Sequence, residues 1–323
     1  MFHIRRALIV GIDDYLQAPL RGCVNDALAI TEALTRNHDG SPNFACRTLA
    51  APPDRITKAN LKEKIEELFS HPADVALLYF SGHGIVSNLG GYLVTPDARK
   101  HDEGVAMQDV LTLAINSRIY EIVIILDCCD SGAFGSIPML NSINAHAFLR
   151  EGISVLTASR SGQPSIESGG NGVFTALICD ALKGGAADIV GNVTVASVYA
   201  FVDQLLGAWD QRPLFKSFVS KLSPLRTCRP DVELPVLRML PLYFPECDYE
   251  YALDPSFEID KTTSLPRNAQ NEAIFRHFQA YRNARLLVPV GEKHLYYAAM
   301  HSRSCKLTSL GRFYWELVKD GRI

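Results

Sequence analysis

A histidine lies between two glycines where an apolar segment ends, in the stretch LLYFSGHGIV at residues 77–86. Two adjacent cysteines follow another apolar segment, in VIILDCCDSG at residues 123–132. The thiolate of a cysteine is the nucleophile, and a thiol has a pKa of roughly 8.5, so a histidine that takes or shares its proton activates it. His83 and one of these cysteines therefore carry the chemistry of a cysteine nucleophile with a histidine base.

The glycines on either side of His83 permit a turn that exposes the imidazole ring. They also leave the Gly84 N–H free to point at a substrate. Together with the N–H of the nucleophilic cysteine, it would form an oxyanion hole with two donors. Losing one such donor costs on the order of 100-fold to 1000-fold in rate.

Short β-branched runs alternate along the chain with segments of helical period, which predicts parallel strands covered by helices. The expected strands are 5–12, 45–51, 75–81, 121–127, 152–159 and 212–220, and the expected helices are 24–37, 57–70, 106–117, 173–184 and 195–207. This order predicts an α/β fold, a three-layer α/β/α sandwich with a mostly parallel sheet. Ligands of such sheets bind beyond the carboxyl ends of the strands, so His83 and the cysteines should meet over one cleft.

The composition changes after about residue 222. Seven of the seventeen prolines lie between Pro224 and Pro266, and residues 231–260 contain eight Asp or Glu against one Lys or Arg. We therefore interpret residues 1–222 as one domain and residues 223–262 as a Pro-rich acidic connector.

Residues 263–323 are expected to form a small C-terminal α+β module of winged-helix type. The pattern predicts a helix at 271–283, strand-like segments at 284–290 and 294–300, and a last helix at 307–321. Residues 261–323 hold eleven Lys or Arg against four Asp or Glu, so the module is basic. Basic charge alone is a weak sign of nucleic-acid binding, and we favour a packing or protein-docking role.

The composition is that of a soluble globular protein, with 323 residues, 47% hydrophobic and 21% charged, and a net charge of -3. This charge gives no global attraction to nucleic acid or to an anionic membrane. We expect a cytoplasmic protein, because the apolar run from Ala7 to Ile12 is too short for a signal peptide and no run suits a membrane span. Eight irregularly spaced cysteines indicate reduced thiols, and no nucleotide-binding motif is present.

Over residues 5–220 the sequence resembles the caspase-like cysteine peptidases, and among them the metacaspase and prokaryotic caspase-homologue branch. The resemblance rests on ALIVGIDDY, LRGCVNDA, LLYFSGHG and LDCCDSG, whereas the QACxG signature of true caspases is absent. In the metacaspase pattern D-x-C-x-S-G the third position is the nucleophile. The resemblance therefore implies Cys129 as nucleophile, with Cys128 as the alternative, and His83 as catalytic base.

Two aspartates are expected at the same sheet edge: Asp26, in GCVND, lies on a loop or helix start after the first strand, and Asp127 ends the strand just before the cysteines. Two carboxylates in one partly buried pocket repel each other unless a cation enters, and a substrate arginine or lysine would be that cation. The resemblance places both in the S1 pocket, with Cys23 and Ser81 as its other lining residues, and implies cleavage after Arg or Lys. The structural alternative makes Asp26 a helix N-cap and Asp127 an internal hydrogen-bond acceptor.

Some metacaspases need calcium, but here only Asp97 and Asp102 lie in a suitable region, without an acidic cluster. We therefore expect no metal site and no required cofactor, with Ca²⁺ not favoured. The segment between the nucleophile and the next strand is long and includes Arg150, a candidate for processing of a zymogen.

The leading hypothesis is a thiol protease that acts on protein substrates as a regulated effector, and prokaryotic relatives suggest a stress or defence role. The alternative is a catalytically silent caspase-like scaffold that docks partners through its C-terminal module. In either case residues 263–323 are a candidate docking site for an activating or inhibitory protein. A transcription regulator would instead bind DNA through this module with strong salt dependence, and we do not expect that.

Overall fold

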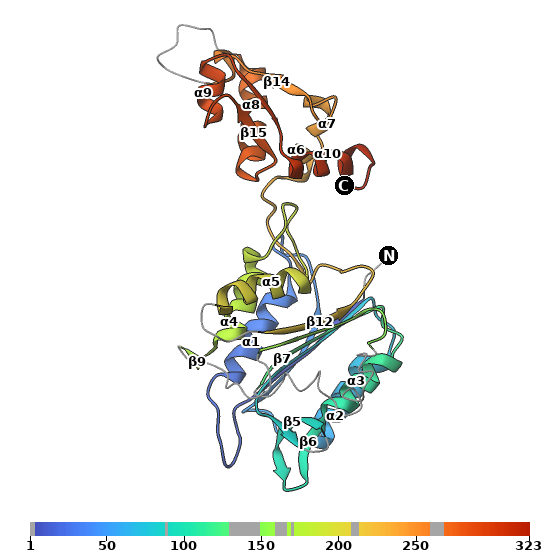
Figure 1. The fold of residues 1–323 in the computed structure, drawn as a ribbon. Helices are drawn as coiled ribbons and strands as arrows, with labels where there is room; N and C mark the ends of the chain where they lie inside the picture. The colour runs from blue at the N-terminus through green and yellow to red at the C-terminus, as the bar shows by residue number, and fades with distance from the viewer. Residues whose placement is uncertain are drawn as a thin grey trace, which may run out of the picture. The chain divides into compact units, whose positions relative to one another are not determined.

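The computed structural model describes residues 4–87, 90–128, 149–158, 167–168, 171–207, 213–258 and 268–323. The chain forms two compact units (Figure 1). The first contains residues 1–187 and 192–228, and the second contains residues 188–191 and 229–323.

The first unit is built on a six-stranded sheet with the order β12-β8-β7-β3-β1-β2. Its strands are β1 (Arg5–Ile12), β2 (Ala45–Ala51), β3 (Val75–Ser81), β7 (Glu121–Asp127), β8 (Ile153–Thr157) and β12 (Leu214–Phe218). Neighbouring strands are parallel except for β12, which pairs antiparallel with β8. The central strands β3 and β7 are buried along their whole length, as expected for a sheet covered on both faces.

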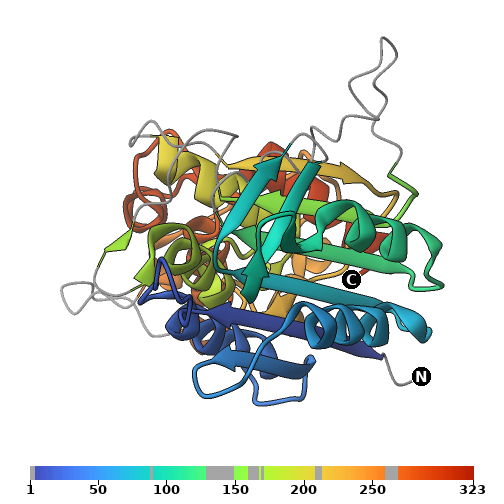
Figure 2. The same ribbon diagram turned by 90° about the horizontal axis from the view of Figure 1, so that it is seen from below.

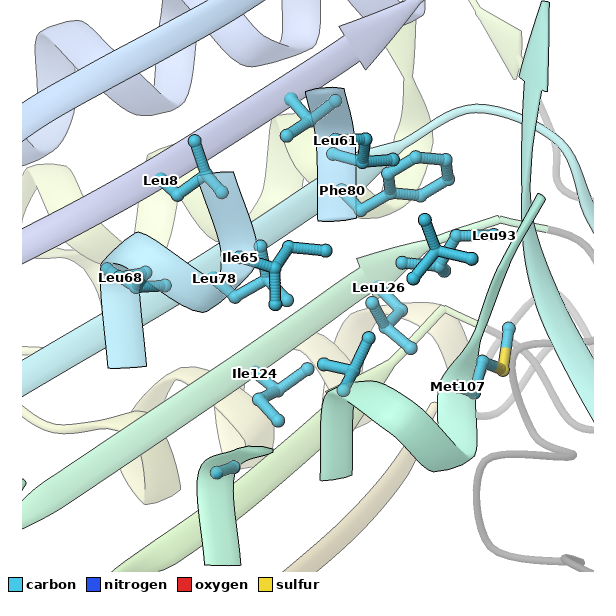
Figure 3. Packing of buried hydrophobic residues seen from close by; sticks show 14 of the residues in the cluster. Leu8, Leu61, Ile65, Leu68, Leu78, Phe80, Leu93, Met107, Ile124 and Leu126 are labelled. Atoms are coloured by element: carbon cyan, nitrogen blue, oxygen red, sulfur yellow. The ribbon is translucent and has the colours of Figure 1, made fainter. Parts of the chain in front are cut away.

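Helices cover both faces of this sheet (Figure 1, Figure 2). They are α1 (Cys23–Thr35), α2 (Lys58–Ser70), α3 (Met107–Asn116), α4 (Val173–Asp180), which continues as a π-helix over Ala181–Gly185, and α5 (Val195–Leu206). Because side chains alternate along a strand, Leu78 and Phe80 pack with α2 and α3, whereas Leu77 and Tyr79 pack with α1, α4 and α5. Figure 3 shows the α2 and α3 side of this packing. The predicted three-layer sandwich is confirmed.

A small antiparallel sheet follows β3 and has the order β4-β5-β6. It consists of β4 (Gly84–Ser87), β5 (Gly90–Arg99) and β6 (Asp102–Ala106), in a region where the sequence predicted no strand. Its close pairing depends on Gly104, which has φ +138° and where a Cβ would lie 2.1 Å from Leu93 O. The two-stranded pairs β9 (Glu167–Ser168) with β10 (Asn171–Gly172) and β11 (Asn192–Val193) with β13 (Arg226–Thr227) complete the strands of this unit that the structure describes.

The second unit is α+β, as predicted. It contains α6 (Leu234–Leu237), α7 (Leu240–Tyr243), β14 (Glu250–Ala252), a 3₁₀ turn (Pro255–Phe257), α8 (Ala269–Asn283), β15 (Leu287–Val290), α9 (Leu295–Met300), β16 (Ser304–Leu307) and α10 (Ser309–Lys319). Its antiparallel sheet has the order β14-β16-β15. Residues 294–300 are not a strand: Leu295, Ala298 and Ala299 are buried at helical spacing in α9. The winged-helix comparison stays a prediction.

The described part of the predicted connector, residues 223–258, belongs to the two compact units. The second unit begins at Arg229, and Leu237, Leu240 and Phe244 are fully buried in its core. The prolines do not mark irregular structure here. Several occupy the first turn of a helix, such as Pro235 in α6, where their missing N–H costs nothing. Across the part of the chain described here, no helix is both long enough and apolar enough for a membrane span.

Candidate active site

His83 lies in the turn between β3 and β4, at the carboxyl edge of the parallel sheet. Its backbone N–H donates a hydrogen bond to the Tyr15 hydroxyl (3.0 Å), which in turn donates to Val94 O (3.2 Å). The Tyr15 and His83 rings are in contact, with centroids 4.5 Å apart. Gly82 makes room for this arrangement, because a Cβ there would lie 2.5 Å from the Tyr15 hydroxyl. Tyr15 therefore positions His83, a role that the sequence argument missed.

The imidazole ring of His83 is oriented by the loop that follows β1. Its Nε2 lies 2.7 Å from the carbonyl oxygen of Ala18. Because a carbonyl only accepts hydrogen bonds, Nε2 must carry the hydrogen in this contact. In the neutral ring the other nitrogen, Nδ1, is then the basic one. The contact with Ala18 therefore leaves Nδ1 as the ring nitrogen that can accept a hydrogen bond or a proton.

The Gly84 N–H is directed away from β5. Gly84 and Leu93 oppose each other in the antiparallel ladder, and the adjacent hydrogen bond joins Val94 N to His83 O (3.0 Å). This pattern makes Gly84 and Leu93 a non-hydrogen-bonded pair, whose N–H groups point away from each other. Since β4 is an edge strand, the Gly84 N–H is available beside His83 for an oxyanion, as the sequence suggested.

Two buried carboxylates lie at the same sheet edge, on the face covered by α1 and α4. Asp26 is 2% exposed and Asp127 is 6% exposed. Gly172 N–H and the Ser81 hydroxyl donate to Asp26, at 3.1 Å and 3.3 Å. The Thr175 hydroxyl donates to Asp127 Oδ2 at 2.6 Å. The structure therefore brings together Asp26, Ser81 and Asp127, which the sequence predicted to share a pocket.

Gly172 lies against both carboxylates. A Cβ at this position would be 2.8 Å from Asp127 Oδ2 and 3.1 Å from Asp26 Oδ2, so only glycine leaves this space open. Burial, and then the charge of Asp127, raise the pKa of Asp26 to about 7. A cation that enters beside the two carboxylates would stabilise their charged forms and so lower the pKa of Asp26.

The alternative reading of Asp26 as a helix cap is wrong. The N-cap of α1 is Gly22, and the carboxylate of Asp13 accepts from Cys23 N–H (2.9 Å) and Val24 N–H (3.3 Å). Asp13 thus accepts hydrogen bonds from the free N–H groups at the start of α1, and Asp26 lies on the buried face of this helix. Cys23 is itself 7% exposed beside this pocket, and burial raises the pKa of its thiol, which keeps it protonated.

The two adjacent cysteines differ in what the structure describes. Cys128 is 1% exposed and belongs to the core on the α2 and α3 side of the sheet. Cys129 lies outside the described residues. A thiol in an apolar core has little thiolate character, so Cys128 is poorly suited to nucleophilic attack.

Arg150 is not brought to this site. It precedes β8, whereas His83 follows the end of β3, Asp127 ends β7 and Asp26 lies in α1, all at the opposite end of the strands. Its guanidinium donates to Ile119 O (2.6 Å), Glu151 O (2.9 Å) and Ser117 Oγ (3.2 Å). As an intact side chain it is held far from the pocket that would have to receive it.

The calcium candidates are engaged with α2. Asp97 accepts from Lys58 N–H (3.0 Å), and Asp102 pairs with Lys58 Nζ at 2.5 Å. Within the described ranges, no group of three or more His, Cys, Asp or Glu residues could hold a metal ion.

Replacing Tyr15 by phenylalanine should lower the free energy of unfolding by about 1–3 kcal/mol, because His83 N–H and Val94 C=O would both lose their partner. Chemical denaturation of Tyr15→Phe against the unmodified protein measures this. Tyr120→Phe is the matched control, since Tyr120 is 63% exposed and its loss should change stability by less than about 0.5 kcal/mol. Equal stability of all three proteins would contradict the role given to Tyr15.

Comparison with known proteins identifies the fold and the family of this chain. A crystal structure of a protein from Geobacter sulfurreducens has the same fold, with a TM-score of 0.50 and 16% identity, over 70% of this chain and 100% of that one. The comparison with curated proteins finds no match. The family model of the caspase domain matches residues 4–222, the unit that carries His83 and the two carboxylates. The chain therefore belongs to the caspase-domain family of cysteine peptidases.

Proposed function

We propose that this protein is a cysteine endopeptidase that cleaves proteins after arginine or lysine, of the metacaspase and prokaryotic caspase-homologue branch. Cys129 is the nucleophile and His83 the base. The observation that carries the proposal is the pair of buried carboxylates, Asp26 in the first turn of α1 and Asp127 at the end of β7, the strand next to the one that leads to His83. A true caspase pocket for aspartate would need basic residues at these positions.

The chemistry follows from the orientation of His83. Nδ1 takes the thiol proton of Cys129 as Sγ attacks the carbonyl carbon of the scissile bond. The N–H groups of Gly84 and Cys129 stabilise the oxyanion of the tetrahedral intermediate. When the C–N bond breaks, His83 gives the proton to the leaving amine and a thioester remains. Water, deprotonated by the same ring, then hydrolyses the thioester and frees the enzyme.

Specificity for a basic residue rests on electrostatics. Within the part of the chain that the structure describes, Asp26 forms no ion pair with a basic side chain, and burial together with the charge of Asp127 raises its pKa. A guanidinium or ammonium group from the substrate would supply the missing charge, with Ser81 and Cys23 beside it. An acidic or apolar side chain would not compensate the buried negative charge.

The proposal also covers regulation. The protein acts as a cytoplasmic effector in a stress or defence response, made as a zymogen, without a cofactor. The second unit docks an activating or inhibitory protein. Processing at Arg150 would first require its three hydrogen bonds to be released, so cutting there would depend on a conformational change or another protease.

The test is cleavage of fluorogenic peptides that end in Arg, Lys or Asp, with the unmodified protein and Cys129→Ala, each with and without calcium. We expect release from the Arg and Lys peptides alone, independent of calcium and absent in the variant. Cleavage of the Asp peptide would overturn the specificity. Equal activity of Cys129→Ala would overturn the mechanism.

Binding of basic ligands should strengthen as pH rises through about 7, because the carboxyl group of Asp26 is neutral below its pKa of about 7. Agmatine carries the arginine side-chain cation at all these pH values, so only the enzyme titrates. Its inhibition constant should rise about tenfold between pH 8 and pH 6, as each pH unit below the pKa weakens binding up to tenfold. An inhibition constant that is constant over this range would contradict the assignment.

A further inference from the structure

A pocket that His83 lines lies beside the buried carboxylates' end of the sheet. It has a volume of about 430 Å³ and is bounded by the loop after β1 and by strands β4 and β5. Apart from His83 and Gly84, its lining is mainly apolar, with Leu16, Ala18, Ile85, Val94 and Pro96. Among the described residues, no acidic side chain and no lysine or arginine lines it. The proposed function above makes no use of this pocket.

The two carboxylates and the apolar pocket lie on either side of the end of β3. Ser81 faces the carboxylates with Tyr79, on the face covered by α1 and α4. Gly82, the next residue, faces Tyr15, which belongs to the core on the α2 and α3 face. Successive residues of a strand point to opposite faces. The two buried carboxylates and the apolar pocket therefore lie on opposite faces of the sheet, with His83 at the carboxyl ends of the strands between them.

The rim of the apolar pocket carries large apolar side chains that are exposed to solvent. Leu16 is 96% exposed and Ile85 is 43% exposed, and both line the pocket next to the His83 ring. Adjacent apolar side chains held open beside a reactive group indicate a surface that an apolar ligand covers.

We propose that this pocket binds the first residue on the leaving-group side of the scissile bond, and that it selects an uncharged apolar side chain such as leucine or phenylalanine. The inference rests on the proposed function. His83 delivers its proton to the leaving nitrogen, so that nitrogen must lie within hydrogen-bond reach of the ring. The side chain before the bond extends to Asp26 and Asp127 on one face, and the chain after the bond then continues toward the other face.

The preference is measured with internally quenched peptides that share one sequence with arginine before the bond. The residue after the bond is leucine, phenylalanine, glycine, aspartate or lysine. We expect kcat/KM to be at least about tenfold higher for leucine and phenylalanine than for aspartate and lysine, with glycine between them, as for other apolar pockets. Mass spectrometry of the products confirms the bond that is cut.

Ile85→Asp provides the structural test. A carboxylate at the rim should lower the leucine-to-lysine ratio of kcat/KM by about tenfold or more. Val86→Asp is the matched control: Val86 is 41% exposed on the same strand, but it does not line the pocket. It should leave the ratio within about twofold. Ala98→Asp places the same charge on another lining residue and tests the pocket should Ile85→Asp fail to fold.

The outcomes separate this inference from the proposed function. Cleavage after arginine with equal rates for all five peptides would overturn the apolar subsite and leave the endopeptidase intact. A ratio that changes equally in Ile85→Asp and Val86→Asp would also overturn it. No cleavage of any peptide, before or after limited proteolysis to release a zymogen, would overturn the proposed function, and the subsite with it.

Discussion

Replacing Cys129 by alanine should lower kcat/KM for arginine peptides by on the order of 10⁴-fold or more, because alanine has no thiol with which to form the thioester. Single-turnover assays with excess enzyme measure the residual rate. Labelling with iodoacetamide at pH 7, followed by peptide mapping, should modify position 129 in the unmodified protein and leave Cys128 largely unmodified, since a buried thiol reacts slowly.

Cys128→Ala is the control for this experiment, because it removes the neighbouring thiol. Cys128 is 1% exposed in the core, so the substitution should cost about 1–2 kcal/mol of stability through lost packing. The rate after arginine should stay within about threefold when the assay is run well below the unfolding temperature. A stable Cys128→Ala protein without activity, beside an active Cys129→Ala protein, would reverse the assignment of the nucleophile.

The main sheet was predictable because its strands have a simple signal. Residues 75–81 and 121–127 are continuous apolar runs, and the structure buries both completely. A strand buried on both faces needs no alternation, so its ends can be read directly from the first polar residues. That is why Ser81 and Asp127 could be placed at one sheet edge before the structure was known.

Asp26 was predictable for a different reason. It lies among the buried positions of α1, three residues after Cys23 and four before Ile30, so helical spacing alone puts it on the face toward the sheet. A carboxylate on an apolar stripe has a functional or structural reason to be there. Sequence could not decide between these reasons, because the partner that caps α1, Asp13, lies ten residues earlier in the chain.

The supports of His83 were not predictable. The Tyr15 hydroxyl and the Ala18 carbonyl reach it across 68 and 65 residues of sequence, and neither contact leaves a local pattern. The apolar pocket next to it was missed for the same reason, since β4 is short and begins at a glycine. Local periodicity carries no information on such contacts until the sheet order is known.

The ionisation of Asp26 makes the free energy of unfolding depend on pH. Its pKa is about 7 in the folded protein, above the ordinary value near 3.9 of an unfolded chain. A raised carboxyl pKa means that the folded state holds its proton more tightly than the unfolded state does. The resulting stability is therefore greatest at low pH and is lost as pH rises from about 4 to about 7. Above pH 7 the ionised group costs up to about 4 kcal/mol.

Replacing Asp26 by asparagine should then separate function from stability. The free energy of unfolding at pH 8 should rise by about 1–4 kcal/mol, because a nearly isosteric neutral group avoids the cost of the buried charge. Cleavage after arginine should fall by on the order of 100-fold or more, as a substrate cation loses a buried partner. Glu66→Gln, the same charge change on the exposed face of α2, should alter neither quantity. Urea denaturation at pH 5 and pH 8, with kcat/KM on arginine peptides, measures both effects. An Asp26→Asn protein that loses stability at pH 8, or that cleaves after arginine at an unchanged rate, would show that this carboxylate is held in place for a reason other than binding a basic side chain.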